Sequence, residues 1–506
     1  MSHPTPPPLV ATAAIAQVPP RVAAVIDGEP QWSGEVFPVI DPYRESVIAE
    51  CVESSPPMVE RAVAAADRAF RSGPWPRLAV EERQAILRRV ADLIDRDAAS
   101  LAALECLNTG IPLRQLEIGQ IRRGAYNFRF FADYIGQSMG EAWHQTAGVT
   151  TLVLRRPAGV AALIGPWNAP LALTSMKVAA ALAFGNTCVV KPAEQTPLTA
   201  WRLLELLHEA GVPAGTVNLV QGRGGVTGAA LVADARLARV SFTGGTVAGR
   251  SVMAAAAPSL VPVTMELGGK SANLVFADAD LDQALDAALL AIFSNNGQQC
   301  LAGSRLLVES SIAPAFLAEF ARRAGRLVLG DPFAAETDLG PLGSRVHRQR
   351  VIGHLERALA DGCELLAGGP NAAVPATGCF VAPTVLRAPH SALPICQEEV
   401  FGPVATVMTF GTLEEACRLA ADTRFGLVAY AWSRNVETLA RLERELRVGT
   451  LWQNLPMTRE LRAPFGGFAD SGVGREGGRA CEAFYTEETT VSRASGPRPP
   501  LRRLGL

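Results

Sequence analysis

From residue 158 onward, short runs rich in β-branched residues alternate with longer runs that have helical spacing. The strand candidates are 159–164, 187–190, 216–220 and 238–242, and the helix candidates between them are 171–183, 198–209 and 225–233. This alternation is typical of βαβ units and predicts a parallel sheet. A second alternating stretch follows Gly269, with helices expected near 281–293, 312–327, 345–360 and 436–445. The sequence thus predicts an α/β protein of two or three domains, at roughly 100–200 residues per domain.

The N-terminal part of the chain has a different texture. Residues 1–20 are rich in Pro and Ala and are expected to be disordered. Apolar residues at helical spacing then predict helices over 59–70 and 86–94. A third helix is expected to end where Gly110 can cap it.

Composition argues against several classes of function. Lys and Arg total 47 against 49 Asp and Glu, and without a basic stripe no nucleic acid partner is expected. The nine cysteines form no Cys-x-x-Cys and the six histidines show no ligand spacing, so no metal is expected. The scattered cysteines fit a reducing compartment. With neither a secretory signal nor an apolar span in view, the protein is expected to be cytoplasmic, with no membrane partner.

One cysteine and one acid form a candidate catalytic pair. Cys300 follows the polar run 297–299 at the end of an apolar helix, which indicates an accessible thiol. Glu266 lies near the junction of the two alternating stretches, a place where ligand clefts tend to form. A thiolate is a strong nucleophile and a carboxylate can activate water, so the pair suggests covalent chemistry at a carbonyl carbon. The alternative is that Cys300 is a small buried apolar side chain.

Three loops at predicted strand ends could contact a ligand. Gly244 and Gly245 open a helix whose N-terminus would favour a phosphate. Lys191 and Glu194 could hold the hydroxyls of a ribose. Asn168, in a stiff loop with two prolines, could donate to a developing oxyanion. Taken singly, each loop is more often an ordinary turn or a solvated surface pair.

Together these segments resemble the aldehyde dehydrogenase superfamily. Seven motifs follow the family's order: Pro-Trp-Asn at 166–168, Lys-Pro-Ala-Glu at 191–194, Phe-Thr-Gly at 242–244, Glu-Leu-Gly-Gly-Lys at 266–270, Gly-Gln-Gln-Cys at 297–300, Glu-Glu-Val-Phe-Gly-Pro at 398–403 and Pro-Phe-Gly-Gly at 464–467. The resemblance implies an aldehyde dehydrogenase fold with a Rossmann-like NAD-binding domain, an α/β catalytic domain and a small β oligomerisation flap. The implied ranges are 21–138 with 158–268, then 269–485, and 139–157 with the tail 486–506. It also implies a homodimer or homotetramer.

The resemblance assigns roles to single residues. Cys300 matches the nucleophile, Glu266 the general base, Asn168 the oxyanion donor, and Lys177 a lysine that helps to orient Asn168. The positions that match cofactor contacts are Ile164, Pro166, Trp167, Lys191, Glu194, Gly224, Gly228, Phe242, Thr243, Gly244, Gly245, Leu267, Glu399 and Phe401. A carboxylate at Glu194 would accept a hydrogen bond from the ribose 2′-OH of NAD and repel the 2′-phosphate of NADP. NAD is therefore the expected cofactor, with NADP as the alternative.

Three residues bear on the substrate. Arg123 and Arg462 resemble arginines that bind the substrate carboxylate in the branch that oxidises muconate-type semialdehydes, and a guanidinium suits a carboxylate. Ala169 replaces a bulkier residue and would widen the substrate tunnel. The expected reaction is the oxidation of a small aldehyde, here a carboxylated semialdehyde from aromatic-compound catabolism, to the acid through a Cys300 thioester.

Several alternatives stay open at this point. The two arginines could form structural ion pairs, and the substrates could be neutral aliphatic or aromatic aldehydes. A CoA-acylating relative would release the thioester to CoA, but such relatives usually lack the residue that matches Glu266. A catalytically retired structural protein would have lost one of the three central residues, all of which are present.

Overall fold

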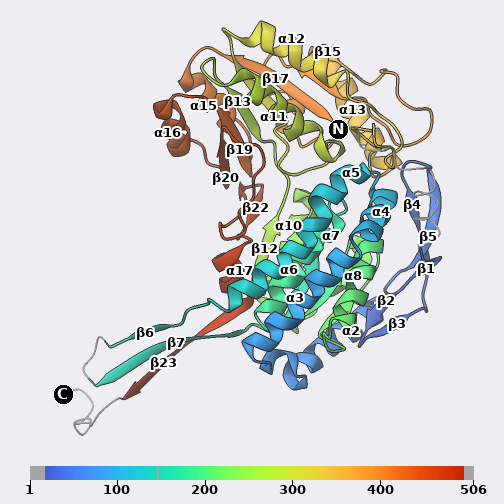
Figure 1. The fold of residues 1–506 in the computed structure, drawn as a ribbon, viewed down its shortest axis with the longest axis vertical. Coiled ribbons are helices and arrows are strands. Elements are labelled where there is room, and N and C mark those ends of the chain that lie inside the picture. The colour runs from blue at the N-terminus through green and yellow to red at the C-terminus, as the bar shows by residue number, and fades with distance from the viewer. Residues whose placement is uncertain (1–17, 145–147, 495–506) are drawn as a thin grey trace.

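Two large sheets form the body of the protein in the computed structural model, which describes residues 18–144 and 148–494. The first sheet has the strand order β22-β12-β11-β8-β9-β10-β2-β3, and β12 through β10 are parallel (Figure 1). Its strands are β2 (Ala24–Ile26), β3 (Glu29–Gln31), β8 (Val160–Ile164), β9 (Thr187–Lys191), β10 (Val217–Leu219), β11 (Leu237–Thr243), β12 (Val263–Glu266) and β22 (Gly472–Val473). The predicted parallel sheet is confirmed. Of the segment 1–20 predicted to be disordered, residues 1–17 lie outside the described residues, as does the tail 495–506.

Helices cover both faces of this sheet because its strand residues alternate between two apolar cores. Ala161 and Leu163 of β8 face the core that contains α7 and α8, whereas Ala162 and Ile164 face the core that contains α2. The helices of this region are α2 (Pro56–Ser72), α3 (Val80–Arg96), α4 (Ala98–Thr109), α5 (Leu113–Gln115), α6 (Ile121–Ile135), α7 (Pro170–Ala183), α8 (Leu198–Glu209), α9 (Ala229–Val232), α10 (Thr246–Ala256) and α17 (Gly478–Tyr485). Gly110 caps α4 with φ 73°, as its position predicts.

Helix α7 is enclosed between the first sheet and α6. All of its residues except Leu173 are buried, and its sequence is apolar apart from Thr174, Ser175 and Lys177, of which only Lys177 is charged. This helix therefore places one positive charge, that of Lys177, in the interior of the protein.

The second sheet has the order β15-β16-β17-β14-β13-β19-β20. Its strands are β13 (Ala272–Val275), β14 (Arg305–Glu309), β15 (Glu364–Ala367), β16 (Thr384–Arg387), β17 (Val404–Phe410), β19 (Val428–Trp432) and β20 (Thr450–Gln453). Its helices are α11 (Leu281–Phe293), α12 (Ala313–Ala324), α13 (Arg345–Ala360), α14 (Pro394–Gln397), α15 (Leu413–Ala421) and α16 (Val436–Glu445). All four helices predicted for this stretch are present. β22 is the one strand of the first sheet that comes from the range 269–485.

Three smaller sheets complete the fold of residues 18–144 and 148–494. One joins β1 (Arg21–Val22), β5 (Ser46–Val52) and β4 (Val36–Asp41), and another pairs β18 (Phe425–Gly426) with β21 (Phe468–Ala469). The third joins β6 (Glu141–Trp143), β7 (Val149–Pro157) and β23 (Thr486–Ala494), and Figure 1 shows it extending away from the body. Among the described residues, no helix combines the length and the apolar character needed to cross a membrane.

The carboxyl ends of four parallel strands meet at one edge of the first sheet. Ile164 is in register with Phe242 and Lys191, and Thr243 is in register with Glu266. Ligands of open α/β sheets bind outside the carboxyl ends of the strands. The pairing register thus brings several of the predicted site residues to one edge.

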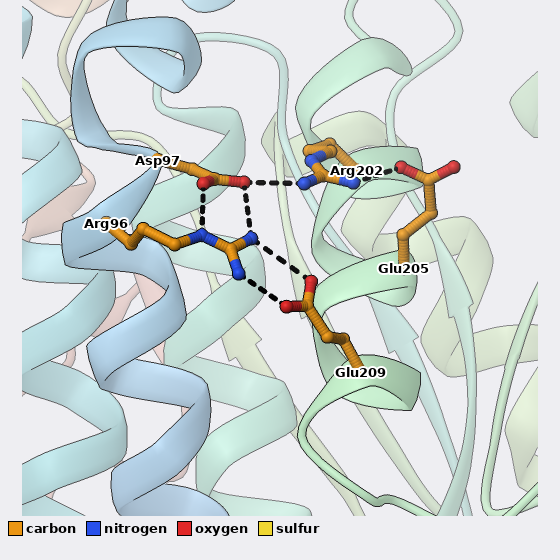
Figure 2. A network of polar contacts seen from close by, with 5 residues as sticks. All are labelled: Arg96, Asp97, Arg202, Glu205 and Glu209. Carbon is orange, nitrogen blue, oxygen red and sulfur yellow. Dashed lines mark hydrogen bonds and ion pairs between the residues drawn. The ribbon is translucent and has the colours of Figure 1, made fainter.

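A polar network fixes the end of α3 against α8 (Figure 2). Asp97, at the junction of α3 and α4, accepts from Arg96 at 2.7 Å and from Arg202 at 2.5 Å. Arg96 also pairs with Glu209, and Arg202 donates to Glu205 at 2.7 Å. Hydrogen bonding to Arg96, opposed by burial and assisted by Arg202, holds the pKa of Asp97 below its ordinary value.

Replacing Asp97 with Asn should lower the melting temperature at low salt, because both arginines lose their shared anion. The decrease in melting temperature should be smaller at 1 M NaCl, because the Debye length falls to about 3 Å and the ion pairs are screened. A depressed carboxyl pKa stabilises the fold above its unfolded value of about 3.9, and this contribution is lost as pH falls through the folded value. Melting curves of the wild type and Asp97→Asn at low salt and at 1 M NaCl check the salt dependence, and melting curves recorded as the pH is lowered check the pH dependence. Asp133→Asn, which removes only the exposed pair with Arg88, is the control.

Candidate active site

A cavity of about 640 Å³ lies at the carboxyl edge of the first sheet and is also lined by residues of the second alternating stretch. Every residue that the sequence matched to a cofactor contact lines this cavity, as do Asn168, Glu266 and Cys300. Chain segments far apart in the sequence therefore supply one site.

Of the nine cysteines, Cys300 is partly exposed and the other eight are buried. Burial raises the pKa of its thiol to about 12, the carboxyl groups of Glu399 and Glu266 add to that rise, and Arg459 and Arg123 oppose it. The thiol is thus accessible but almost fully protonated at neutral pH. It can act as a nucleophile only if a neighbouring base takes its proton.

The loop before Cys300 has an unusual backbone. Asn295 and Asn296 both have φ 56°, a left-handed conformation that Asn tolerates better than most residues. Gly297 follows with φ 72°, and a Cβ there would lie 2.3 Å from the backbone of Gly402. The close approach of these two chain segments therefore requires glycine.

Asn168 lies just before helix α7, and its side chain is buried. Its Nδ2 donates to the backbone carbonyl of Gln298 at 2.8 Å. An amide nitrogen carries two hydrogens, so one remains for another acceptor. The loop that holds Cys300 therefore also fixes the direction of this free N–H.

Glu266 ends β12, and its Oε1 is buried with no hydrogen-bond partner among the described residues. Burial raises its pKa well above the ordinary range, the charge of Glu476 adds to the rise, and Lys177 opposes it. A Cβ on Gly466 would lie 2.8 Å from that Oε1. Glu266 can therefore act as a base nearer to neutral pH than an ordinary carboxylate.

Lys177 donates to Ser241 Oγ at 2.8 Å and to Glu476 Oε1 at 2.7 Å. Neither hydrogen bond is made to Asn168, so Lys177 can help to orient Asn168 only indirectly. The reason is distance along α7, since nine residues span about two and a half helical turns. Burial raises the pKa of Glu476, but Lys177 and Arg459 outweigh this and hold it below the ordinary value. Glu476 lies outside the seven matched motifs, so the sequence did not point to it.

Glu399 closes the cavity from the side of the second sheet. It accepts from the backbone N–H of Gly269 at 3.0 Å, and burial raises its pKa to about 7. A Cβ on Gly268 would lie 2.0 Å from Glu399 Oε2, so only glycine allows this contact. Phe401 lies 5.2 Å from Trp167, in an edge-to-face arrangement.

Three glycines, Gly224, Gly225 and Gly245, line the other end of the cavity. An added Cβ on Gly224, Gly225 or Gly245 would meet no atom within 4 Å, although all three line the cavity. Lys191 Nζ lies 3.8 Å from Glu194 Oε2 at the end of β9. Open space over glycines beside a helix N-terminus suits a phosphate group.

Two arginines near Cys300 have buried nitrogens that lack hydrogen-bond partners within the described part of the chain. These are Nε and Nη2 of Arg123, on α6, and Nη2 of Arg459. Burial and, to a smaller extent, the charge of Arg459 together lower the pKa of Arg123 to about 9. The Arg459 guanidinium lies over the ring of Phe465, 4.4 Å from its centroid. The pair presents unsatisfied donors of the kind that bind an anion.

Arg462, which the sequence analysis paired with Arg123, does not join this group. Its side chain is 78% exposed and forms an ion pair with Glu460 at 2.7 Å. Leu461 is buried directly before it, so the chain turns Arg462 outward. The run 459–462 begins and ends with arginine, and only the packing decides which one faces inward. Ala169 is also buried and lies outside the residues that line the cavity.

Comparisons with known proteins agree with this arrangement. The model of the Aldehyde dehydrogenase family matches residues 30–491. The chain is 42% identical to 5-carboxymethyl-2-hydroxymuconate semialdehyde dehydrogenase of Escherichia coli, over 90% of this chain and 97% of that protein. The solved structure of HpcC from Thermus thermophilus is similar with a TM-score of 0.94 and 40% identity, covering 98% of each chain.

A third similar protein is betaine aldehyde dehydrogenase from Staphylococcus aureus, solved in complex with NAD+. Its TM-score is 0.93 at 35% identity, covering 97% of this chain and 98% of that one. This chain belongs to the aldehyde dehydrogenase family, which confirms the expected fold. It is an oxidoreductase of the class that oxidises aldehydes.

The accessibility of Cys300 predicts its reaction with alkylating reagents. Iodoacetamide should modify one thiol per native chain, and mass spectrometry should map it to Cys300. Because the thiolate reacts and the thiol pKa is raised, the rate should rise about tenfold per pH unit between pH 7 and 9. Cys300→Ala should abolish the fast labelling. A rate that levels off below pH 8 would instead show a depressed pKa.

Proposed function

We propose that this protein oxidises an aldehyde to a carboxylic acid, with NAD as the hydride acceptor, through a thioester on Cys300. The observation that carries the proposal is the convergence of three groups on one cavity. These are a partly exposed thiol at Cys300, an amide with a free N–H at Asn168, and an unpaired buried carboxyl at Glu266.

The first step is attack of Cys300 on the aldehyde carbon. Glu266, whose pKa is raised, can take the thiol proton near neutral pH. The carbonyl oxygen becomes an oxyanion, and the free N–H of Asn168 stabilises it. The product of this step is a thiohemiacetal on Cys300.

Loss of hydride from the thiohemiacetal leaves a thioester on Cys300. Once Glu266 has passed the thiol proton to solvent, it takes a proton from water, and the resulting hydroxide attacks the thioester. The acid is released as Glu266 returns this proton to the sulfur of Cys300. Glu476, kept ionised by Lys177, repels the negative charge of Glu266 and keeps it basic. Release to water rather than to CoA follows from the presence of this base.

NAD fits the cavity at both of its ends. The glycines at 224–225 and 245 would leave room for the pyrophosphate, and Glu194 with Lys191 would bind the adenosine ribose. Glu399 would accept from the nicotinamide ribose, beside Phe401. When bound, NAD would serve as the hydride acceptor. A carboxylate at Glu194 disfavours the extra phosphate of NADP, which is therefore the less favoured cofactor.

Mixing the protein with NAD and a panel of aldehydes should produce NADH, measured as absorbance at 340 nm. Cys300→Ala should abolish the signal. Glu266→Gln should form at most one NADH per site, and slowly, because the base that takes the thiol proton is lost and any thioester that forms is not hydrolysed. No NADH with any aldehyde would favour a retired structural protein. A strict requirement for CoA would favour an acylating enzyme.

For the substrate, we infer a semialdehyde that carries a carboxylate, bound by Arg123 and Arg459. Their buried nitrogens lack partners among the described residues, and a carboxylate would satisfy them. Two positive charges beside Cys300 would also repel a cationic aldehyde such as betaine aldehyde. Similarity to the Escherichia coli semialdehyde enzyme is in line with this inference. Neutral aliphatic or aromatic aldehydes are the alternative substrates.

Arg123→Ala and Arg459→Ala should each raise KM for a carboxylated semialdehyde by about 10- to 100-fold, since each removes a charged hydrogen bond. The same variants should change KM for a neutral aldehyde of similar size only slightly. Arg462→Ala is the matched control and should leave both values unchanged. Equal effects on both substrates would contradict the carboxylate site, and a larger effect of Arg462→Ala would contradict the choice of Arg459.

We further propose that the protein is a homo-oligomer that associates through the sheet of β6, β7 and β23. This sheet extends away from the body (Figure 1). Trp143 of β6 and Leu154 of β7 are exposed, as is Met139 just before β6. Unpaired strand edges and exposed apolar side chains favour a protein partner.

A further inference from the structure

Asn295 binds two backbone carbonyl groups that determine the position of Asn168, the proposed oxyanion donor. Its side-chain Nδ2 donates to the backbone oxygen of Asn168 and to that of Gln298, both at 2.9 Å. The Gln298 oxygen is the same atom that accepts from the Asn168 side chain at 2.8 Å. One amide thus fixes both the backbone of Asn168 and the acceptor that orients its side chain.

The direction of the Asn295 amide is itself determined by Gln120. Its Oδ1 accepts from Gln120 Nε2 at 2.5 Å, which requires the oxygen on that side and the NH₂ group facing the two carbonyls. The backbone N–H of Asn295 donates to Gln115 Oε1 at 2.9 Å, and its backbone oxygen accepts from Gln298. Gln120 ends the π-helical turn η2 (Leu116–Gln120), one helical turn before Arg123. π-Helical turns are frequent at functional sites.

The left-handed backbone of Asn295 is part of the same arrangement. With φ 56° it is one of two consecutive asparagines in this conformation, at 8% exposure. The neighbouring Asn296 bonds elsewhere, donating to the carbonyls of Gly110 and Pro341. The turn therefore directs the amide of Asn295 toward Asn168 and Gln298, and the amide of Asn296 toward Gly110 and Pro341. The two neighbouring amides bind different segments.

We propose that Asn295, oriented by Gln120, is a positioning residue that directs the free N–H of Asn168 toward the oxyanion. This inference rests on the proposed role of Asn168. Without the Asn295 amide, the Gln298 carbonyl loses one donor and the Asn168 backbone loses its anchor, so the free N–H is no longer held toward the carbonyl oxygen. The effect acts on kcat rather than on cofactor affinity, because Asn295 does not line the cavity where NAD is proposed to bind.

Asn295→Gly is the sharpest test, because glycine tolerates the positive φ while the side chain that carries the amide is removed. We expect kcat to fall about tenfold or more, short of the 10²–10³-fold loss for removing an oxyanion donor. The Kd for NADH, measured by fluorescence, should not change. Gln299→Ala is the matched control, since this neighbouring amide donates only to Ser294 and Ala291. An equal kcat loss in Gln299→Ala would show a general loop effect and overturn the proposal.

A double-mutant cycle with Asn168→Ala separates the possible outcomes. If Asn295 acts through Asn168, Asn295→Gly should cost less than about twofold more in the Asn168→Ala background. A full further loss would overturn the inference while leaving the proposed function intact. If Asn168→Ala alone left kcat unchanged, the oxyanion assignment in the proposed function would fail instead. Should Asn295→Gly not fold, Gln120→Ala frees the amide to rotate and should lower kcat in the same direction.

Discussion

Buried charge at the edge of the first sheet is the constraint on which the rest of the site depends. Lys177 and Glu476 form an ion pair in the interior, and a charge removed from water is costly without such a partner. Glu266 lies in the same low-dielectric region, where the negative charge of Glu476 makes it harder to ionise. The raised pKa of Glu266 is therefore a consequence of burial and of the neighbouring charge of Glu476, not of Glu266 alone.

The enclosure in turn depends on helix α7. Its apolar surface lets it lie between the first sheet and α6, which places Lys177 inside and leaves Asn168 at the start of the helix. The parallel register of β11 and β12 then brings Glu266 to the same edge. The nucleophile comes from the loop after α11, and its left-handed turn at 295–297 lets the loop approach Gly402 closely. The site is thus assembled from rigid elements that converge.

Much of the fold could be predicted because the relevant signals are local. α8 was predicted over 198–209 and occupies that range, and the capping of α4 by Gly110 followed from one residue. All residues matched to cofactor contacts line the cavity, since they lie in motifs at strand ends. The small edge strand β22 was not foreseen, because two residues carry no periodicity.

The differences from the sequence-based predictions concern the direction and partners of side chains, which depend on tertiary packing. Arg459 and Arg462 share a short run, yet one faces Cys300 and the other faces solvent, because Leu461 packs inward between them. Lys177 bonds to Glu476, about 300 residues away in sequence, and the chain reveals such a pairing only when folded.

The sequence by itself determined the α/β class, the ranges of most helices and the identity of the residues that gather at the cavity. These depend on periodicity, turn chemistry and motifs within short windows. Only the tertiary structure decided which arginine faces inward, that Glu476 accompanies Glu266, and that Asn295 holds the carbonyls around Asn168. Those features arise from contacts between distant segments, and burial and electrostatic coupling exist only once the segments have been brought together.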